Sequence, residues 1–156
     1  MNFNVTGYDT DFLSIKIAEY LFPKLENLYY LQQDFNDCNI QYDVISATSL
    51  LSVMKEKKES LKKLISLLKD QNSALIIIEP TKHLTPYNVY KFMRSQRVFW
   101  SYKALMLWAL ARKNRHLEDD FFKNLTDICI TQTDALEGMI QFTYIKHSMQ
   151  DVKKFV

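Results

Sequence analysis

Acidic side chains follow the first two β-prone runs of the chain, and they are its best candidates for binding chemistry. Asp9 comes directly after the run Phe3–Tyr8, and Asp34 comes shortly after the run Leu28–Gln32. A carboxylate at the carboxyl end of a parallel strand can accept two hydrogen bonds from vicinal hydroxyl groups. The alternative for Asp9 is an N-cap of the following helix, and the alternative for Asp34 is a turn-forming residue beside a core Phe35.

Three further polar residues follow later runs of the same kind. Ser46 lies at the end of the run Tyr42–Ala47, where its hydroxyl could hold an amine or hydroxyl group, although a plain exit from a strand explains it as well. Glu79 and His83 follow the run Ala74–Ile78. Because histidine titrates near neutral pH, His83 could act as a general base, and the alternative is a solvated loop residue.

Composition argues against several kinds of site. The chain has two glycines, Gly7 and Gly138, whereas about eleven are expected at an average usage of 7%, so no glycine-rich phosphate loop is expected. No metal site is expected either, because the histidines lack acidic or thiol partners at ligand spacing. The two cysteines, Cys38 and Cys129, lie far apart and are expected to be core thiols in a reducing compartment.

Charge and hydropathy limit the partners. The net charge of +2 does not indicate a dedicated nucleic-acid clamp. Aromatic and basic residues alternate between Tyr90 and Arg112, a pattern that suits stacking on single-stranded nucleic acid, the core of a helical region, or a surface for a partner protein. No apolar run reaches the roughly 20 residues that span a bilayer. We therefore expect a cytoplasmic protein with neither a membrane nor a nucleic acid as partner.

The elements that must position these residues alternate between strand and helix. Strands are expected at Phe3–Tyr8, Leu28–Gln32, Tyr42–Ala47 and Ala74–Ile78, and the last, a continuous β-branched run, is typical of a strand buried on both faces. Helices are expected at Phe12–Phe22 (capped by Thr10 or Asp9), Lys55–Lys69 and Tyr87–Lys113, with a helical turn or two at Phe121–Leu125. The runs Ile128–Gln132 and Met139–Ile145 predict two antiparallel strands joined around Glu137 and Gly138.

This order of elements predicts an α/β fold. Strands separated by helices favour parallel pairing, and the final pair favours an antiparallel hairpin at the edge of a mostly parallel sheet. The sequence contains no internal repeat, low-complexity tract or linker. Residues 1–156 are therefore expected to form one domain.

The order and the strand ends resemble the class I methyltransferases that depend on S-adenosylmethionine (SAM), which have a Rossmann-like sheet. The resemblance covers nearly the whole chain and is carried by Gly7-Tyr8-Asp9, Gln33-Asp34-Phe35, Tyr42-Asp43-Val44-Ile45, Ala74–Pro80 and the closing hairpin Ile128–Ile145. It implies SAM as cofactor, bound by Asp9, Thr10, Asp34, Phe35 and Ser46, with Glu79 and His83 as candidates for substrate binding. The family's first strand and Gly-x-Gly loop would precede Phe3, and both are expected to be absent.

Two functions fit this resemblance. The first is methyl transfer from SAM to a small molecule or another acceptor, a displacement that depends on alignment more than on a strong acid or base. The second is a non-catalytic binding or scaffold subunit that keeps the methyltransferase fold. Without the first strand, its neighbours would expose edges that pair with a second copy or a partner chain. We therefore expect either a homo-oligomer or a partner that completes the sheet.

Overall fold

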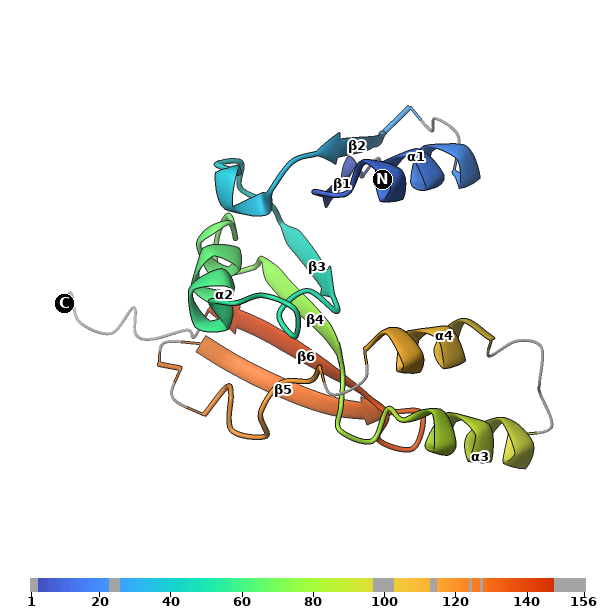
Figure 1. The fold of residues 1–156 in the computed structure, drawn as a ribbon. Helices are drawn as coiled ribbons and strands as arrows, with labels where there is room; N and C mark the ends of the chain where they lie inside the picture. The colour runs from blue at the N-terminus through green and yellow to red at the C-terminus, as the bar shows by residue number, and fades with distance from the viewer. Residues whose placement is uncertain are drawn as a thin grey trace. The chain divides into compact units, whose positions relative to one another are not determined.

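The computed structural model describes residues 3–22, 26–96, 103–112, 115–123, 125–126 and 128–147. The chain forms two compact units, residues 1–40 and residues 41–156. Its described strands and helices make a mixed α/β structure, which confirms the predicted fold class (Figure 1). No helix of this described part is long and apolar enough to cross a membrane.

The first unit is a parallel strand pair with a connecting helix. Its elements are β1 (Val5–Asp9), α1 (Phe12–Leu21), β2 (Leu28–Gln32) and the short 3-10 helix η1 (Phe35–Asp37). The two strands are in register from Val5 opposite Leu28 to Asp9 opposite Gln32. The parallel pairing is the one expected for a strand–helix–strand unit, and it places the carboxyl ends of both strands at the same edge.

Asp11 caps α1, so the prediction of Thr10 or Asp9 as the cap was wrong. The Asp11 carboxylate accepts hydrogen bonds from the hydroxyl and the amide of Ser14, each at 2.8 Å, and these bonds hold the pKa of Asp11 below its ordinary value. Asp9 is still part of β1, and its Oδ1 accepts a hydrogen bond from the Asp11 amide at 2.9 Å. The strand therefore ends one residue closer to the helix than its apolar pattern indicates.

The second unit is a four-stranded sheet with helices. Its elements are β3 (Val44–Thr48), α2 (Lys57–Ser66), β4 (Ala74–Pro80), α3 (Pro86–Gln96), α4 (Lys103–Ala111), β5 (Ile128–Ala135) and β6 (Ile140–His147). The strand order is β3-β4-β6-β5, in which β4 runs parallel to β3 and antiparallel to β6 (Figure 1). Five of the seven residues of β4 are buried, as predicted from the run Ala74–Ile78.

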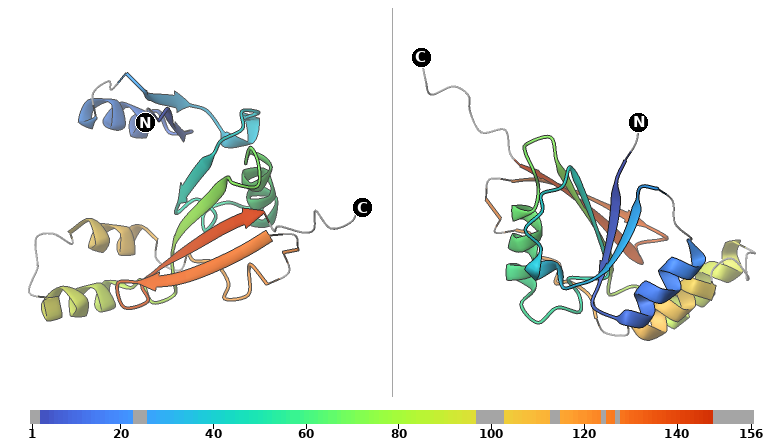
Figure 2. Two further views of the ribbon diagram at one scale, coloured as in Figure 1. Left: turned by 180° about the vertical axis from the view of Figure 1, so that it is seen from behind. Right: turned by 90° about the horizontal axis from the view of Figure 1, so that it is seen from above.

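Two helices replace the single helix predicted for Tyr87–Lys113. The described part of α3 ends at Gln96 and α4 begins at Lys103, and the two helices lie side by side in both views of Figure 2. They share one apolar core with the tip of the β5–β6 hairpin: Leu84, Val89, Phe92, Met93, Leu105, Ala109, Met139 and Ile140. Both helices bury an apolar face in this core, which a single straight helix could not do, and residues 97–102 and 113 of the predicted helix lie outside the described part of the chain.

Two smaller predictions also need correction. Within the segment predicted as helix from Phe121 to Leu125, residues 121–123 form hydrogen-bonded turns, in which the Phe121 amide donates to the Glu118 carbonyl and the Lys123 amide to that of Asp120, and residue 124 lies outside the described part of the chain. Cys38 is buried as expected, but Cys129 is exposed. Cys129 lies on β5, which is paired with β6 on one side and is an edge strand of the described sheet.

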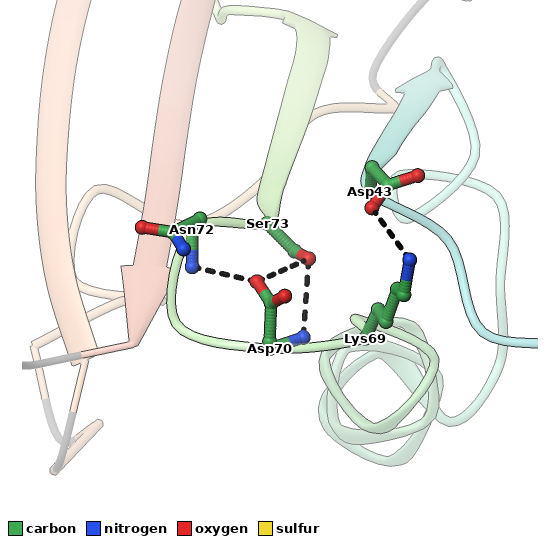
Figure 3. Close-up of polar contacts among 5 residues, drawn as sticks. All are labelled: Asp43, Lys69, Asp70, Asn72 and Ser73. Carbon is green, nitrogen blue, oxygen red and sulfur yellow. Dashed lines mark hydrogen bonds and ion pairs between the residues drawn. The ribbon is translucent and has the colours of Figure 1, made fainter.

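The amino ends of β3 and β4 are fixed by a compact turn after α2. The Asp70 carboxylate accepts hydrogen bonds from the Asn72 amide at 2.8 Å and the Ser73 hydroxyl at 3.2 Å, and Lys69 pairs with Asp43 at 3.3 Å (Figure 3). The Asn72 amide is the main reason that the pKa of Asp70 lies below its ordinary value. Since this end is closed by local polar bonds, the opposite, carboxyl edge is the place to look for a ligand.

The β5–β6 hairpin turns through three consecutive residues with left-handed backbones, and this geometry generates a prediction. The φ angles are 50° at Leu136, 56° at Glu137 and 80° at Gly138. A Cβ on Gly138 would meet no atom within 4 Å, so Gly138→Ala tests the left-handed backbone without a steric clash. We expect it to lower the free energy of unfolding by roughly 1 kcal/mol, measured by urea denaturation.

Glu137→Gly is the matched control for this prediction. It relieves the strain of a left-handed backbone at residue 137, which stabilises the fold, but it also adds conformational freedom to the unfolded chain, which destabilises the fold. Because the two contributions oppose each other, the free energy of unfolding should change less than in Gly138→Ala. Equal stability of the Gly138→Ala variant and the parent would contradict the turn geometry.

Candidate functional site

Asp9 and Asp34 lie at the same edge of the first unit. Asp9 is the last residue of β1, and Asp34 follows the end of β2 by two residues. The Gln33 amide between them donates a hydrogen bond to the Asp9 carbonyl at 3.1 Å, which ties the two strand ends together. The parallel register therefore brings the two carboxylates to one edge, as the sequence predicts.

Each of these carboxylates uses one oxygen to hold the local backbone. Oδ1 of Asp9 accepts from the Asp11 amide, and Oδ1 of Asp34 accepts from both the backbone and the side-chain nitrogen of Asn36, each at 2.9 Å. Neither Oδ2 atom has a hydrogen-bond partner within the described part of the chain. Asp9 is exposed and Asp34 is half-buried, so both orient a carboxylate oxygen that is available to a donor.

The neighbours of these acids complete the edge. Phe35 is the half-buried first residue of η1, and the exposed Thr10 accepts a hydrogen bond from the Gln32 side chain through its carbonyl at 3.4 Å. Asp34 caps η1, which is the turn-forming role weighed as its alternative. Capping and ligand binding are compatible here, because capping occupies only one carboxylate oxygen.

The second unit holds the other predicted residues. Ser46 is exposed and lies in the middle of β3, because this strand continues to Thr48 rather than ending at Ala47. The residue at the turn is Ser49, whose backbone is left-handed at φ 51° and whose amide donates to the Ile78 carbonyl at 2.8 Å. Sequence reasoning missed Ser49, although a polar residue directly after a strand was a signal for it.

Glu79 is a buried acceptor for the loop after β3. Its side chain is 3% exposed, and its Oε1 accepts hydrogen bonds from the amides of Leu51 at 2.7 Å and Ser52 at 3.3 Å. Within the described residues, Glu79 Oε2 and Ser52 Oγ make no hydrogen bond of good geometry, although the Ser52 hydroxyl is close enough to the carboxylate to influence its pKa. The predicted substrate-binding residue is thus placed where it fixes the backbone beside the carboxyl ends of β3 and β4.

Burial raises the pKa of the Glu79 carboxyl above its ordinary value of 4.5. The Ser52 hydroxyl, the two loop amides and the positive charge of Arg112 all favour the carboxylate and oppose this effect. Desolvation is the largest influence, since a charged oxygen inside the unit has lost its water.

Trp108 holds the same loop from another element. Its indole Nε1 on α4 donates a hydrogen bond to Ser49 Oγ at 2.8 Å. The loop from Ser49 to Ser52 is therefore bound by β4 through Glu79 and by α4 through Trp108. The sequence analysis considered Trp108 only as one of several aromatic residues. Its indole N–H, a hydrogen-bond donor that needs a partner when buried, could have indicated this role.

His83 lies in the exposed turn between β4 and α3. Its amide donates to Thr81 Oγ1 at 3.1 Å and its carbonyl accepts from the Asn88 side chain at 2.9 Å. Nearby, Lys82 pairs with Asp119 at 2.6 Å and is the main reason that the pKa of Asp119 lies below its ordinary value. No three His, Cys, Asp or Glu residues of the described part are grouped to hold a metal ion.

The buried Glu79 predicts a pH-dependent stability. Because its pKa is higher in the folded chain than in the unfolded one, its contribution is fully present below pH 4.5 and is lost as pH rises through the folded pKa. Glu79→Gln keeps an oxygen for the loop amides and removes the ionisation. We expect the difference in urea midpoint between variant and parent to shift in favour of the variant as pH rises from 4 to about 8.

Glu79→Leu removes both the ionisable group and the hydrogen-bond acceptor, so comparing it with Glu79→Gln isolates the contribution of the acceptor. Relative to Glu79→Gln, it should cost roughly 1–3 kcal/mol for each amide left without a partner, at every pH. If the urea midpoints of the parent and Glu79→Gln changed in parallel with pH, that result would contradict a buried Glu79 that titrates.

Comparison with known proteins finds similar structures but no similar sequences. No protein-family model matches the sequence, and no curated protein sequence is similar to it. The chain is similar to the plantazolicin methyltransferase BpumL in complex with a pentazolic desmethylPZN analog and SAH, with 14% identity, a TM-score of 0.62, and coverage of 93% of this chain and 67% of that one.

Two other solved structures show the same likeness. The N-methyltransferase NodS from Bradyrhizobium japonicum WM9 in complex with S-adenosyl-l-homocysteine (SAH) has 10% identity and a TM-score of 0.57, with 92% of this chain and 66% of that one covered. A putative type 11 methyltransferase from Sulfolobus solfataricus has 12% identity and a TM-score of 0.58, with coverages of 98% and 77%. The chain thus spans about two thirds of the length of BpumL and NodS. It has the Rossmann-like fold of the SAM-dependent methyltransferases.

Proposed function

We propose that this chain acts in SAM-dependent methyl transfer to a small molecule or another acceptor, and that the first unit holds the nucleoside part of SAM. The observation that carries the proposal is the pair of carboxylates, Asp9 and Asp34, at the carboxyl ends of two adjacent parallel strands. Ligands of open α/β sheets bind at this edge. The SAH in the BpumL and NodS structures supports the same class of cofactor.

The donor and acceptor chemistry of these residues fits a nucleoside. The free oxygen of Asp9 can accept hydrogen bonds from ribose hydroxyls, and that of Asp34 can accept one from an adenine amine. The ring of Phe35 offers a flat apolar surface beside Asp34, and Thr10 adds a hydroxyl next to Asp9. Since all four residues lie at one edge of a strand pair, they can recognise one ligand together.

Methyl transfer from SAM requires little acid or base catalysis from the protein. When bound, SAM supplies an activated methyl group, and its transfer depends on alignment with an unprotonated acceptor. In the second unit, Glu79 and His83 remain candidates for contact with the acceptor, and Ser46, predicted to bind SAM, has a hydroxyl that could also hold an amine or hydroxyl acceptor. The exposed hydroxyl of Ser46 is the most accessible of them for a direct hydrogen bond, because Glu79 is buried by its loop.

Asp9→Ala tests the cofactor part of this proposal. The variant should weaken SAM binding by about tenfold or more, because two hydrogen bonds to a charged acceptor are lost. The measurement is calorimetry with SAM and with SAH on the full chain, with far-ultraviolet circular dichroism to establish that the variant is folded.

Asp37→Ala is the matched control. Asp37 is an exposed acid of the same unit, in η1 rather than at a strand end, so its removal changes the charge equally and should leave SAM affinity unchanged. Unchanged affinity in a folded Asp9→Ala variant would remove Asp9 from the site. An equal loss of SAM affinity in Asp9→Ala and Asp37→Ala would show that the loss comes from the change in net charge alone.

A non-catalytic subunit is a second candidate function, and one observation favours it. Within the described residues, β1 is hydrogen-bonded only to β2, and β3 only to β4, so each has one edge of unpaired backbone groups. Such edges pair readily with another strand. A second copy or a partner chain that supplies a strand would fit this candidate.

Light scattering combined with a SAM titration separates the two candidates. A scaffold subunit should form a dimer or larger assembly and release no heat with SAM. A monomer that binds SAM would exclude the scaffold function, and an assembly that binds SAM would support methyl transfer by the assembled form.

A further inference from the structure

A cavity lies between the carboxyl end of α2 and the start of β5, and we call it the α2–β5 cavity. Its volume is about 440 Å³, which is within the range of sites that hold small molecules. It is lined by residues of α2, of the segment before β5 and of β5 itself: Lys62, Ile65, Ser66, Leu68, Leu125, Thr126 and Ile128. All of these residues belong to the second unit, so the cavity is formed within that unit.

The strand register places the α2–β5 cavity away from the carboxyl edge of β3 and β4. Near the start of β5, Ile130 is opposite Ile145 of β6, which in turn pairs with Leu75 near the start of β4. Glu79 lies at the other end of β4. A ligand in the cavity therefore leaves the edge proposed for the methyl acceptor free, and the inference does not depend on methyl transfer.

Four of the lining residues are apolar, and three of them are only partly covered. Ile65, Leu125 and Ile128 are half-buried, and Leu68 is buried. Because β5 is an edge strand, no further strand covers this side within the described part of the chain. These side chains can therefore bury more apolar surface by taking up an apolar ligand.

The polar lining of the cavity carries one positive charge. Lys62 is exposed, and it makes no ion pair with any described residue. The Ser66 hydroxyl already donates to the Lys63 carbonyl at 2.8 Å, so among the hydroxyls of the lining that of Thr126 is the one available as a donor. No Asp or Glu is among the described residues of the lining.

We propose that the α2–β5 cavity binds a small molecule that has an apolar chain and a single carboxylate, such as a medium-chain fatty acid. The chain lies against the four apolar residues of the lining. The carboxylate pairs with the Lys62 ammonium and accepts a hydrogen bond from the Thr126 hydroxyl. Charge complementarity supports this class of ligand, since the described lining offers one cation and no anion.

Other small molecules fit this lining less well. A neutral alcohol of the same length uses the apolar residues but gains nothing from the charge of Lys62. An alkylammonium ion is repelled by that charge. A phosphate monoester carries about two negative charges, whereas the described lining supplies one positive charge.

A nuclear magnetic resonance titration of the full chain with octanoate tests the inference. The amides of residues 62–68 and of Ile128 should shift and reach saturation, with a dissociation constant of about 1 mM or below. Octanol should bind roughly tenfold more weakly, and octylammonium more weakly again. Added salt should weaken the binding of octanoate and leave that of octanol unchanged.

Two variants separate the charged contribution from the apolar one. Lys62→Gln should weaken octanoate binding by about tenfold and leave octanol binding unchanged, because it removes the charge alone. Ser66→Phe places a ring in the cavity from an exposed position, so it should abolish the binding of both ligands. Lys58→Gln is the matched control, since Lys58 is an exposed lysine of α2 that does not line the cavity. Circular dichroism monitors the fold of each variant.

Three results would overturn the inference. The first is a folded parent chain in which octanoate causes no saturable shift at the residues of the cavity. The second is an equal loss of octanoate affinity in Lys62→Gln and Lys58→Gln, which would point to net charge alone. The third is binding of octanol or octylammonium as tight as that of octanoate, which would remove the carboxylate from the proposed ligand.

Discussion

The hydrogen bonding of β4 on both edges is the interaction on which the second unit depends. This strand pairs in parallel with β3 and antiparallel with β6, and its apolar run is buried between the two. The parallel partner brings the carboxyl ends of β3 and β4 together, where Glu79 reaches the loop from Ser49 to Ser52. The antiparallel partner brings in the hairpin tip that supplies the core of α3 and α4.

The fold could be predicted well where the sequence pattern is local. The run Ala74–Ile78 contains little besides β-branched and other apolar residues, and only a strand covered on both faces accounts for it. The alternation around Gly138 likewise predicted the hairpin, although the strands extend further, to Ala135 and His147. Cross-strand polar bonds, such as that of Gln141 to Asp134 at 3.4 Å, accompany the pairing beyond the apolar pattern.

The predictions that failed depend on tertiary packing or on a choice between similar residues. Asp9, Thr10 and Asp11 are all good cap formers, and only the length of β1 determines that Asp11 takes the role. The division into α3 and α4 goes with a shared core that no helical periodicity reveals. For the candidate site, the edge shared by Asp9 and Asp34 could be predicted because parallel pairing fixes it. The burial of Glu79 could not, since it depends on a loop that folds back over the strand end.

The edge strand β5 has a consequence for the behaviour of the protein in concentrated solution. Its second half, Thr131 to Asp134, exposes hydroxyl, amide and carboxylate groups in succession, and Gln141 on β6 bonds to Asp134 at 3.4 Å. A fibril grows when a flat apolar edge accepts strand after strand, and solvated polar groups with a carboxylate make each such addition unfavourable. The polar side chains of β5 therefore disfavour amyloid-like growth on this side of the sheet, and the exposed Cys129 on the same strand provides a position at which a fluorescent label can report on such growth.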